Sequence, residues 1–309
     1  MRQAIDCIAA AFREDPIVPP RHVHSLGGAP HERLLLSMPA FGRDGAFAIK
    51  LVTVFPDNAA AGLPSIQGVV VLFSATGAPV AVLDGATVTR LRTAAASALA
   101  SKYLSRTDSK ALLVMGTGAL APYLAQAHCL VREIRSILVW GRHPDRIAAT
   151  VESIRGLVEP DIVVQPTSAA LESAASADII SCSTASEHPI LEGKWLRAGT
   201  FVDLVGSFSP QRREADDDVM ARSRIFVDTL EGALAEAGDV LQPLARGVIQ
   251  RASIEADLAS LARGQHPGRA DSREIIVFKS VGSALEDLAM AQWIVEEQRL
   301  REDKRSSSL

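Results

Sequence analysis

The chain has 309 residues, which is enough for about two domains of ordinary size. Hydrophobic residues make up 48% and charged residues 22% of the sequence, as in folded globular proteins, which argues against wholesale disorder. Lysine and arginine total 32 against 36 acidic residues, so the formal net charge is −4, and aromatic residues make up only 5%. Nucleic acid is therefore not an expected partner, because its binders need a basic surface or aromatic stacking platforms.

The cysteines and the apolar stretches indicate where the protein resides. Cys7, Cys129 and Cys182 are too few and too far apart for a disulfide framework or a zinc ribbon. No stretch approaches the roughly 18 uncharged apolar residues of a membrane span. The N-terminal segment carries acids inside its only apolar stretch, unlike a secretory signal. We therefore expect a protein of the reducing cytoplasm that has no membrane anchor.

The first hundred residues predict a strand-rich region followed by one long helix. Apolar, β-branched runs bounded by Gly, Pro and Asp predict strands over Leu34–Phe41 and Ala46–Phe55. Two more runs, Gly68–Phe73 and Val80–Leu83, flank a stretch with Gly and Pro and predict a hairpin. The period then changes, because Thr87–Leu104 carries Ala and Leu at helical spacing without Gly or Pro.

From residue 110 onward, strand and helix patterns alternate. Short apolar runs separated by Ala-rich helical stretches predict an α/β fold with a doubly wound parallel sheet. A further amphipathic helix is predicted over Ala284–Leu300. The predicted strands cover Ala111–Met115, Ile137–Trp140, Asp161–Val164, Asp178–Ser181, Phe201–Val205 and Ile225–Val227.

A G-x-G-x-x-A motif begins where the first of these strands ends, with Gly116, Gly118 and Ala121 at its three fixed positions. The first glycine permits a tight turn, the second lets backbone amides approach a pyrophosphate, and the small third residue lets helix and strand pack closely. The helix N-terminus favours the negative charge. We predict a dinucleotide site that includes Gly116, Gly118, Ala119 and Leu120. A plain strand–helix connection is the alternative.

The end of the next strand indicates which nicotinamide cofactor binds. An NAD site usually places Asp or Glu there to accept the ribose 2′-hydroxyl, whereas this chain has Gly141 and Arg142. A guanidinium suits the 2′-phosphate of NADPH through charge-assisted hydrogen bonds. We therefore expect NADPH to be preferred, with NADH possible. A solvated loop position for Arg142 is the alternative.

Several segments together resemble the ornithine cyclodeaminase/mu-crystallin family over nearly the whole chain. They are MPAF (38–41), IKLVTVFPDN (49–58), LDGATVTRLRTAAASALA (83–100), MGTGALA (115–121), VGSFSPQRRE (205–214), LAEAGDV (234–240) and VFKSVGSALEDLAMA (277–291). The resemblance implies a Rossmann-type dinucleotide-binding domain over 107–277. It also implies a second α+β domain, for substrate binding and dimerisation, over 1–106 with 278–309. A homodimer formed through the sheet of that domain is implied as well.

The resemblance implies that Arg21, Lys50 and Arg92 bind a substrate carboxylate. The sequence around Lys50 agrees, because a lysine in an otherwise apolar strand needs an anionic partner when it is buried. The alternatives are a strand-edge lysine that faces water and a solvated arginine on a helix. The positions that match the family's cofactor contacts are Ser65, Thr93, Thr184, Val202–Val205, Ser280 and Val281.

The segment that begins at Gly206 departs from the cyclodeaminase pattern. Cyclodeaminases carry a catalytic acid just after this glycine, whereas this chain has Ser207 and Phe208. Removing ammonia from ornithine requires proton transfers at nitrogen, which an aromatic ring cannot provide. The segment is similar to that of family members that reduce the cyclic imino acids 1-pyrroline-2-carboxylate and 1-piperideine-2-carboxylate to L-proline and L-pipecolate. We expect that reaction, with Lys50 positioning the substrate and Ser207 relaying to the ring nitrogen through water.

Three other activities stay open at this point. Two are enzymes of the same family, an ornithine cyclodeaminase and an alanine dehydrogenase. The third is a non-catalytic, mu-crystallin-like protein that binds NADPH and a small hydrophobic ligand. A metal centre is not expected, because His22 and His24 have no second cluster of ligands in the sequence.

Overall fold

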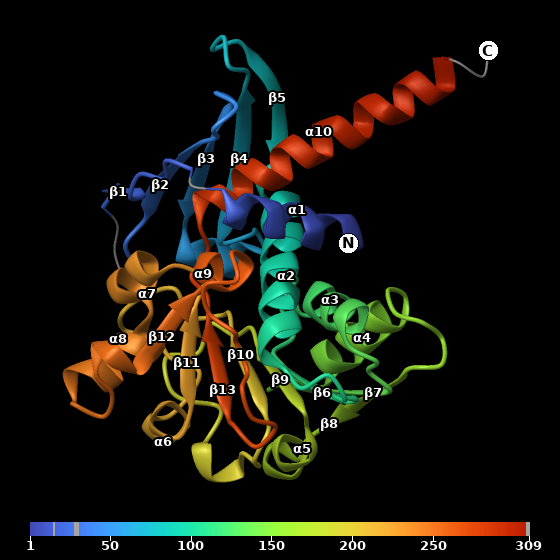
Figure 1. The fold of residues 1–309 in the computed structure, drawn as a ribbon, viewed down its shortest axis with the longest axis vertical. Coiled ribbons are helices and arrows are strands. Elements are labelled where there is room, and N and C mark those ends of the chain that lie inside the picture. The colour runs from blue at the N-terminus through green and yellow to red at the C-terminus, as the bar shows by residue number, and fades with distance from the viewer. Residues whose placement is uncertain (15, 28–30, 307–309) are drawn as a thin grey trace. The chain divides into compact units, whose positions relative to one another are not determined.

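The computed structural model describes residues 1–14, 16–27 and 31–306, and it divides into two compact units (Figure 1). Unit 1 comprises residues 1–5 and 93–282, and unit 2 comprises residues 6–92 and 283–309. Helix α2 (Gly85–Leu104) contributes to both units, because the division falls inside it. The predicted boundary at 106/107 lies just beyond the end of this helix, and the one predicted at 277/278 lies five residues before the observed division after Gly282.

Unit 1 is built on an eight-stranded parallel sheet with the order β12-β11-β13-β10-β9-β6-β7-β8. The residues of β9, β10 and β13 are all buried, as expected of parallel strands covered on both faces. The predicted doubly wound sheet is therefore confirmed. The strands are β6 (Ala111–Met115), β7 (Ser136–Trp140), β8 (Val163–Thr167), β9 (Ile179–Cys182), β10 (Phe201–Leu204), β11 (Arg224–Val227), β12 (Ile254–Asp257) and β13 (Ile276–Lys279).

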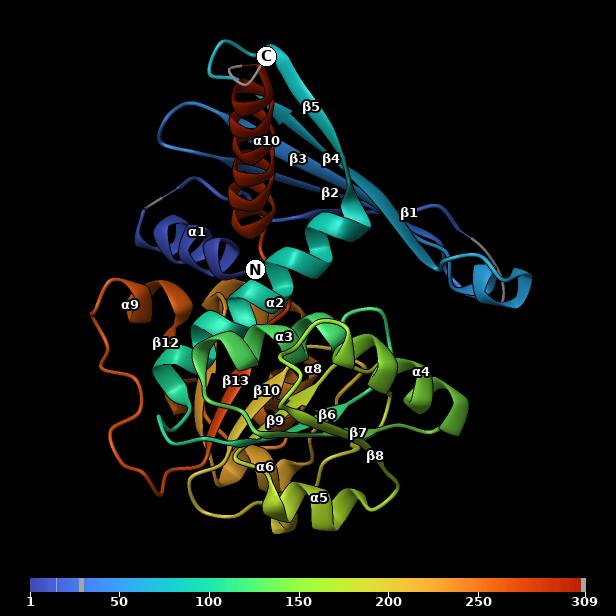
Figure 2. The same cartoon turned by 90° about the vertical axis from the view of Figure 1, so that its right-hand side faces the viewer.

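Helices cover both faces of this sheet. Figure 2 shows α3 (Ala121–Val131) and α4 (Pro144–Arg155) on one face, with α5 (Ala170–Ser176) and α6 (Asp217–Ala221) on the other. The shorter connecting elements are α7 (Leu230–Glu236), α8 (Gly238–Ala245), α9 (Leu258–Ala262) and the 3-10 helices η2 (Gly193–Trp195) and η3 (Arg251–Ser253).

The strand order creates a switch point beside β6. The chain runs from β6 to β7 and β8 toward one edge of the sheet, and then returns to place β9 on the other side of β6. In open α/β sheets, ligands bind outside the carboxyl ends of the strands at such a point. The turn that starts at Gly116 and the loop that contains Thr184 follow β6 and β9 directly, so both lie at this edge.

Unit 2 holds a five-stranded antiparallel sheet with the order β1-β2-β3-β4-β5 and the predicted β4–β5 hairpin. Helix α10 (Ala284–Ser306) packs on β2, β3 and β4 (Figure 1). Helix α1 (Arg2–Arg13) is tied to it, because the Cys7 thiol donates to the carbonyl oxygen of Ala289 over 3.2 Å. The strands are β1 (His22–Ser25), β2 (Leu34–Phe41), β3 (Phe47–Val54), β4 (Ile66–Phe73) and β5 (Pro79–Asp84), and η1 (Pro56–Ala61) lies between β3 and β4.

Four elements lie outside the predicted set: α1, β1, β12 and β13. β1 (HVHS) and β12 (IEAD) mix apolar and polar residues over only four positions, too few for a periodic pattern, whereas β13 follows an apolar run that is itself a strand signal. The strand expected over Asp161–Val164 begins at Val163 instead, and the C-terminal helix continues past its predicted end to Ser306. These shifts leave the predicted architecture unchanged.

Candidate active site

The turn after β6 has the geometry of a dinucleotide-binding turn. Gly116 has a φ of 132°, and a Cβ there would lie 2.8 Å from the carbonyl oxygen of Ser183, so only glycine fits. Gly118 is exposed while Ala121 is fully buried at the start of α3. The turn therefore presents its backbone outward and packs its helix closely, which are the two properties that a bound pyrophosphate requires.

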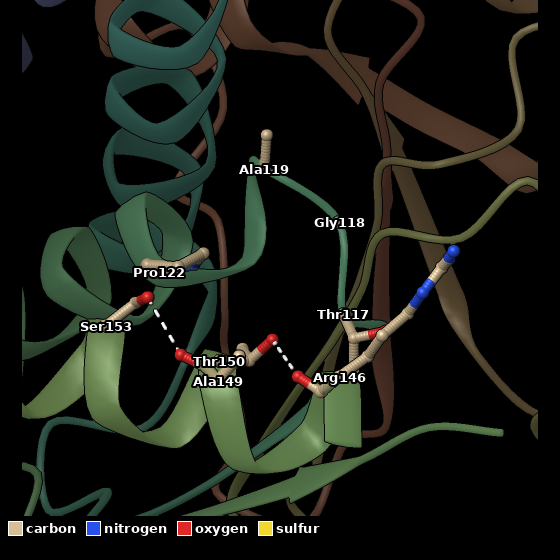
Figure 3. Close-up of a pocket in the computed structure, with 8 residues that line it drawn as sticks. All are labelled: Thr117, Gly118, Ala119, Pro122, Arg146, Ala149, Thr150 and Ser153. Carbon is tan, nitrogen blue, oxygen red and sulfur yellow. Dashed lines mark hydrogen bonds between the residues drawn. The ribbon is translucent and has the colours of Figure 1, made fainter. Parts of the chain in front are cut away.

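A pocket of about 320 Å³ opens beside this turn (Figure 3). Figure 3 shows the side chain of Arg146 extending from the start of α4 past Thr117. Arg142 is exposed in the loop just before α4, outside this lining. Arg146 is thus a second guanidinium near the turn that sequence analysis missed, although it follows Arg142 by only four residues. The lining residues are Thr117, Gly118, Ala119, Pro122, Arg146, Ala149, Thr150 and Ser153.

Gly141 is required by packing under the same turn. A Cβ at this position would lie 2.7 Å from the Cγ2 atom of Thr117 and 3.3 Å from the Cγ1 atom of Ile147. The close approach brings the end of β7 directly against the glycine turn. The structure therefore gives Gly141 a packing reason for being glycine, and its contact with a cofactor stays a prediction.

The loops after β9 and β10 are joined by a residue that sequence analysis did not place in the site, Glu214. This carboxylate is fully buried and accepts hydrogen bonds from the backbone N–H of Thr184 (2.6 Å), the hydroxyl of Thr184 (2.9 Å) and the N–H of Gly206 (2.7 Å). A Cβ on Gly206 would lie 2.1 Å from the carbonyl oxygen of Thr184, so the two loops touch. Burial raises the pKa of Glu214 to about 7, while the nearby Lys279 opposes the rise.

The residues at the cyclodeaminase acid position have different surroundings. Ser207 is buried, and its hydroxyl donates to the carbonyl oxygen of Arg212 within the same loop. Phe208 is 41% exposed. Since the Ser207 proton is used inside the loop, its role as a relay to the substrate stays a prediction.

The loop after β13 is held by a second buried carboxylate. Asp228 accepts hydrogen bonds from the N–H groups of Val281 (2.8 Å) and Gly282 (2.6 Å), and burial raises its pKa. Ser280 and Val281 are themselves buried at this edge of the sheet, as is Val205 at the end of β10. Thr184, Val205, Ser280 and Val281 thus gather where the parallel strands end.

Unit 2 holds a cluster of charges, buried except for the half-buried Arg21, which we call the cation cluster: Arg21, Lys50, Arg92, Glu286 and Asp287. The Nζ atom of Lys50 lies 2.9 Å from Oδ1 and 2.7 Å from Oδ2 of Asp287. The Nη1 atom of Arg92 lies 2.8 Å from Oε2 of Glu286, and its Nε atom lies 3.3 Å from Oδ1 of Asp287. Lys50 is 3% and Arg92 7% exposed, which excludes the alternatives in which these two side chains face water.

The electrostatics of the cation cluster favour an anionic ligand. Burial lowers the pKa of Lys50 to about 8; Asp287 opposes this shift, whereas Arg92 and Arg21 add to it. The effect of Arg21 requires that its charge lie near Lys50. Lys50 and Arg92 pair with the two carboxylates, and the half-buried Arg21 adds a third positive charge near Lys50. A small carboxylate suits these cations as a ligand.

Two predicted cofactor residues show only local roles. The hydroxyl of Ser65, in unit 2, donates to the carbonyl oxygen of Pro56 over 3.4 Å. Thr93, in unit 1, is 6% exposed on α2. Their contact with a cofactor stays a prediction.

Residues 1–14, 16–27 and 31–306 hold neither a cluster of metal ligands nor a membrane-spanning helix. No group of three or more His, Cys, Asp or Glu side chains in these ranges is arranged to hold a metal ion, and His22 and His24 are exposed on β1. No helix in the same ranges combines the length and the hydrophobicity needed to cross a bilayer.

Comparison with known proteins identifies the family. Residues 1–302 match the ornithine cyclodeaminase/mu-crystallin family. The chain is 36% identical over 299 residues to a Delta(1)-pyrroline-2-carboxylate reductase of Colwellia psychrerythraea, which covers 95% of this chain and 94% of the relative.

Two solved structures share the fold. The Delta(1)-pyrroline-2-carboxylate reductase of Thermococcus litoralis in complex with NADH and L-proline is similar with a TM-score of 0.92 and 34% identity, covering 97% of this chain and 94% of that one. An archaeal alanine dehydrogenase dimer with bound NAD is similar with a TM-score of 0.88 and 28% identity, covering 98% and 92%. The chain therefore belongs to the ornithine cyclodeaminase/mu-crystallin family.

Proposed function

We propose that this protein is an NAD(P)H-dependent reductase that converts 1-pyrroline-2-carboxylate or 1-piperideine-2-carboxylate to L-proline or L-pipecolate. The observation that carries the proposal is the cation cluster of unit 2, in which two buried cations, Lys50 and Arg92, lie together with Arg21 nearby and suit a small monocarboxylate. The glycine turn of unit 1 suits a dinucleotide. The relatives named as pyrroline-2-carboxylate reductases, one of them bound to NADH and L-proline, support the same reaction.

The residues of this chain bind and orient the substrate rather than perform acid–base chemistry. The nicotinamide, when bound, supplies the hydride that adds to the imine carbon. Lys50 and Arg92, with Arg21 nearby, hold the substrate carboxylate through charge-assisted hydrogen bonds. A cyclic imine that arrives protonated already has an electrophilic carbon, so hydride addition yields the neutral amine without a protein acid. Positioning is then the main contribution of the protein.

A pair of assays tests this function. We expect NADPH oxidation with 1-pyrroline-2-carboxylate or 1-piperideine-2-carboxylate, and no release of ammonia from L-ornithine with NAD. The missing acid accounts for the second result, because a general acid or base contributes about 10²–10⁴-fold. Robust NAD-linked proline formation from ornithine would contradict the proposal. NADPH binding without oxidation by any cyclic imine would favour the mu-crystallin-like binding protein.

We propose in addition that the cofactor is NADPH rather than NADH, because two guanidinium groups, Arg142 and Arg146, lie near the glycine turn and the loop of residues 141–143 between β7 and α4 carries no acid. Arg142→Ala should weaken NADPH but not NADH by about 1–3 kcal/mol if the contact to the 2′-phosphate is charge-assisted. Arg135→Ala, at the other end of β7, is the matched control, since Arg135 pairs with Asp161 at the surface. Equal losses for both cofactors would show that Arg142 does not touch the phosphate.

We propose that two copies associate through the sheet of unit 2 and that the protein works in the cytoplasm. Leu51, Val69 and Val82 are 36%, 39% and 67% exposed on the face opposite α10, and the similar alanine dehydrogenase is a dimer. Leu51→Glu should convert a dimer to a monomer in light scattering, and an unchanged mass would contradict the interface. Three free cysteines suit a reducing compartment.

A further inference from the structure

The carboxyl edge of the unit 1 sheet holds a second group of buried charges, which we call the carboxylate cluster. Its members are Glu214, Asp228, Asp239 and Lys279, all with no exposed surface. Three carboxylates thus face a single ammonium group. Burying uncompensated charge is costly, and the proposed imine reduction does not by itself need any of these residues, so the cluster requires an explanation.

Glu214 joins two loops through three hydrogen bonds. One carboxylate oxygen accepts from both the N–H and the hydroxyl of Thr184, and the other accepts from the N–H of Gly206. Each of these three partners is a donor. The ionised form satisfies all three donors at once, since a carboxylate accepts at both of its oxygens.

The rest of the carboxylate cluster holds Glu214 and the neighbouring loop in place. Oδ1 of Asp239 accepts from the N–H groups of Glu214 (2.7 Å) and Ala215 (3.0 Å), while its Oδ2 lies 3.1 Å from Nζ of Lys279. Asp228 fixes the loop that follows Lys279. The loops after β9, β10 and β13 are therefore all anchored to one cluster, at the sheet edge where a dinucleotide binds.

We propose that Glu214 is a positioning residue for the reductase, and that only its ionised form holds the loops at Thr184 and Gly206 in the arrangement that hydride transfer needs. The inference rests on the proposed function. Protonation removes the negative charge that strengthens all three hydrogen bonds and turns one acceptor oxygen into a donor, so it weakens the link between the two loops. The catalytic chemistry stays with the cofactor and the substrate.

The surroundings of Glu214 place this proton in an accessible pH range. Burial and the charge of Asp239 on α8 raise the pKa of Glu214, and Lys279 on β13 opposes them, which leaves the pKa at about 7. The Cys182 thiol on β9 is the other titratable group that faces it, and burial raises the pKa of that thiol well above its usual value. A pKa of about 7 means that Glu214 changes charge near neutral pH.

The test compares kcat of the wild type and Glu214→Gln at a series of pH values. A protonated glutamic acid and a glutamine have the same shape and the same number of electrons, so the two proteins should be alike below about pH 6. The ratio of wild-type to variant kcat should then rise through pH 7 to about 10–100-fold, because one N–H would face an amide N–H₂. Taking the ratio cancels the ionisation of the imine substrate.

A matched control separates this effect from the loss of any carboxylate. Glu274→Gln weakens an ion pair with Arg224 at the opposite, amino end of β13. The ratio of wild-type kcat to the kcat of this variant should stay near one at every pH. A Glu214→Gln ratio that is near one throughout, or large but independent of pH, would overturn the inference. If Glu214→Gln does not fold, Thr184→Val removes only one hydroxyl donor and should still lower kcat by about 3–10-fold.

A second measurement does not depend on imine reduction. In bound NADPH, NOEs between the nicotinamide ring and its ribose should show one ring orientation in the wild type and a mixture of orientations in Glu214→Gln. The Kd for NADPH should change by less than about threefold, because the pyrophosphate contacts remain. A single orientation in both proteins would overturn the inference. A wild type that orders the ring but reduces no imine would instead contradict the proposed function alone.

Discussion

Two buried lysines, one in each unit, have the same kind of partner but opposite surroundings. Lys50 in unit 2 and Lys279 in unit 1 each face one aspartate, Asp287 and Asp239, at about the same distance (2.7 and 3.1 Å). Around Lys50, the cation cluster adds a second buried cation, Arg92, and the half-buried Arg21 to its two carboxylates. Around Lys279, the carboxylate cluster has three acids and no second cation.

The different charge surroundings of the two lysines indicate what each cluster binds. A buried group of charges that does not balance internally must recruit a counter-charge or change its protonation. A cation excess recruits an anion, which is the property of a carboxylate-binding site. A carboxylate excess recruits a proton, which is the property of a pH-sensitive anchor. This contrast supports the separate roles proposed for the two clusters, one for the substrate and one for the loops around the cofactor.

The largest expected effect is on stability, when Lys279 is replaced. Lys279→Met leaves Asp239 and its neighbouring carboxylates buried without their cation, and breaking a buried pair in this way costs about 3–5 kcal/mol. Lys50→Met should cost about 1 kcal/mol or less, because Asp287 keeps Arg92 and burial already lowers the pKa of the Lys50 ammonium. Urea unfolding of both variants measures the difference.

The loss of unfolding free energy in Lys279→Met should depend on pH. Glu214 has a pKa raised in the folded protein, so its protonated form is favoured by folding and stability is lost as pH rises from the unfolded value toward about 7. Without Lys279 this loss should grow and extend to higher pH. The deficit should therefore be smaller at about pH 5 than at about pH 8. Equal costs for the two lysine variants at both pH values would contradict the contrast between the clusters.

The next effect is on activity, when Lys50 is replaced. Lys50→Met should lower kcat/KM for the cyclic imine by about 10–100-fold, mainly through KM, because one charge-assisted contact to the substrate carboxylate is lost. The Kd for NADPH should not change. Lys102→Met, an exposed lysine on α2, is the control. A Lys50→Met variant with normal kcat/KM would return Lys50 to a purely structural role.

The elements predicted from sequence are those that a local pattern determines. The residues of the glycine turn lie within six positions, so a local motif predicts them, whereas the role of Lys50 is implied by the family resemblance and only agrees with its place in an apolar strand. The partner of Lys50 was not found, since Asp287 lies 237 residues away and reads locally as an ordinary acid in the first turn of a helix.

The carboxylate cluster could not be predicted for the same reason. Glu214, Asp239 and Lys279 come from a loop, a short helix and a four-residue strand, and only the sheet order brings them together. The one local signal was β13, where Ile275–Phe278 is an apolar run long enough for a buried strand. A predicted strand there would have placed Lys279 at its carboxyl end.

The smallest expected effect is an alkaline limb in the activity. Because burial and the two arginines bring the pKa of Lys50 to about 8, the free enzyme loses this cation as pH rises above that value. Above about pH 8 we expect kcat/KM to fall by up to about tenfold per pH unit. The fall in kcat should begin only at higher pH, because a bound carboxylate favours the charged form of Lys50 and raises its pKa. Lys50→Arg keeps its charge at all these pH values and should remove the part of the limb that belongs to Lys50, leaving the part due to the imine itself. If kcat/KM falls in the same way at alkaline pH in Lys50→Arg and in the wild type, the ionisation of the substrate alone accounts for the fall. Lys50 would then stay charged over this pH range.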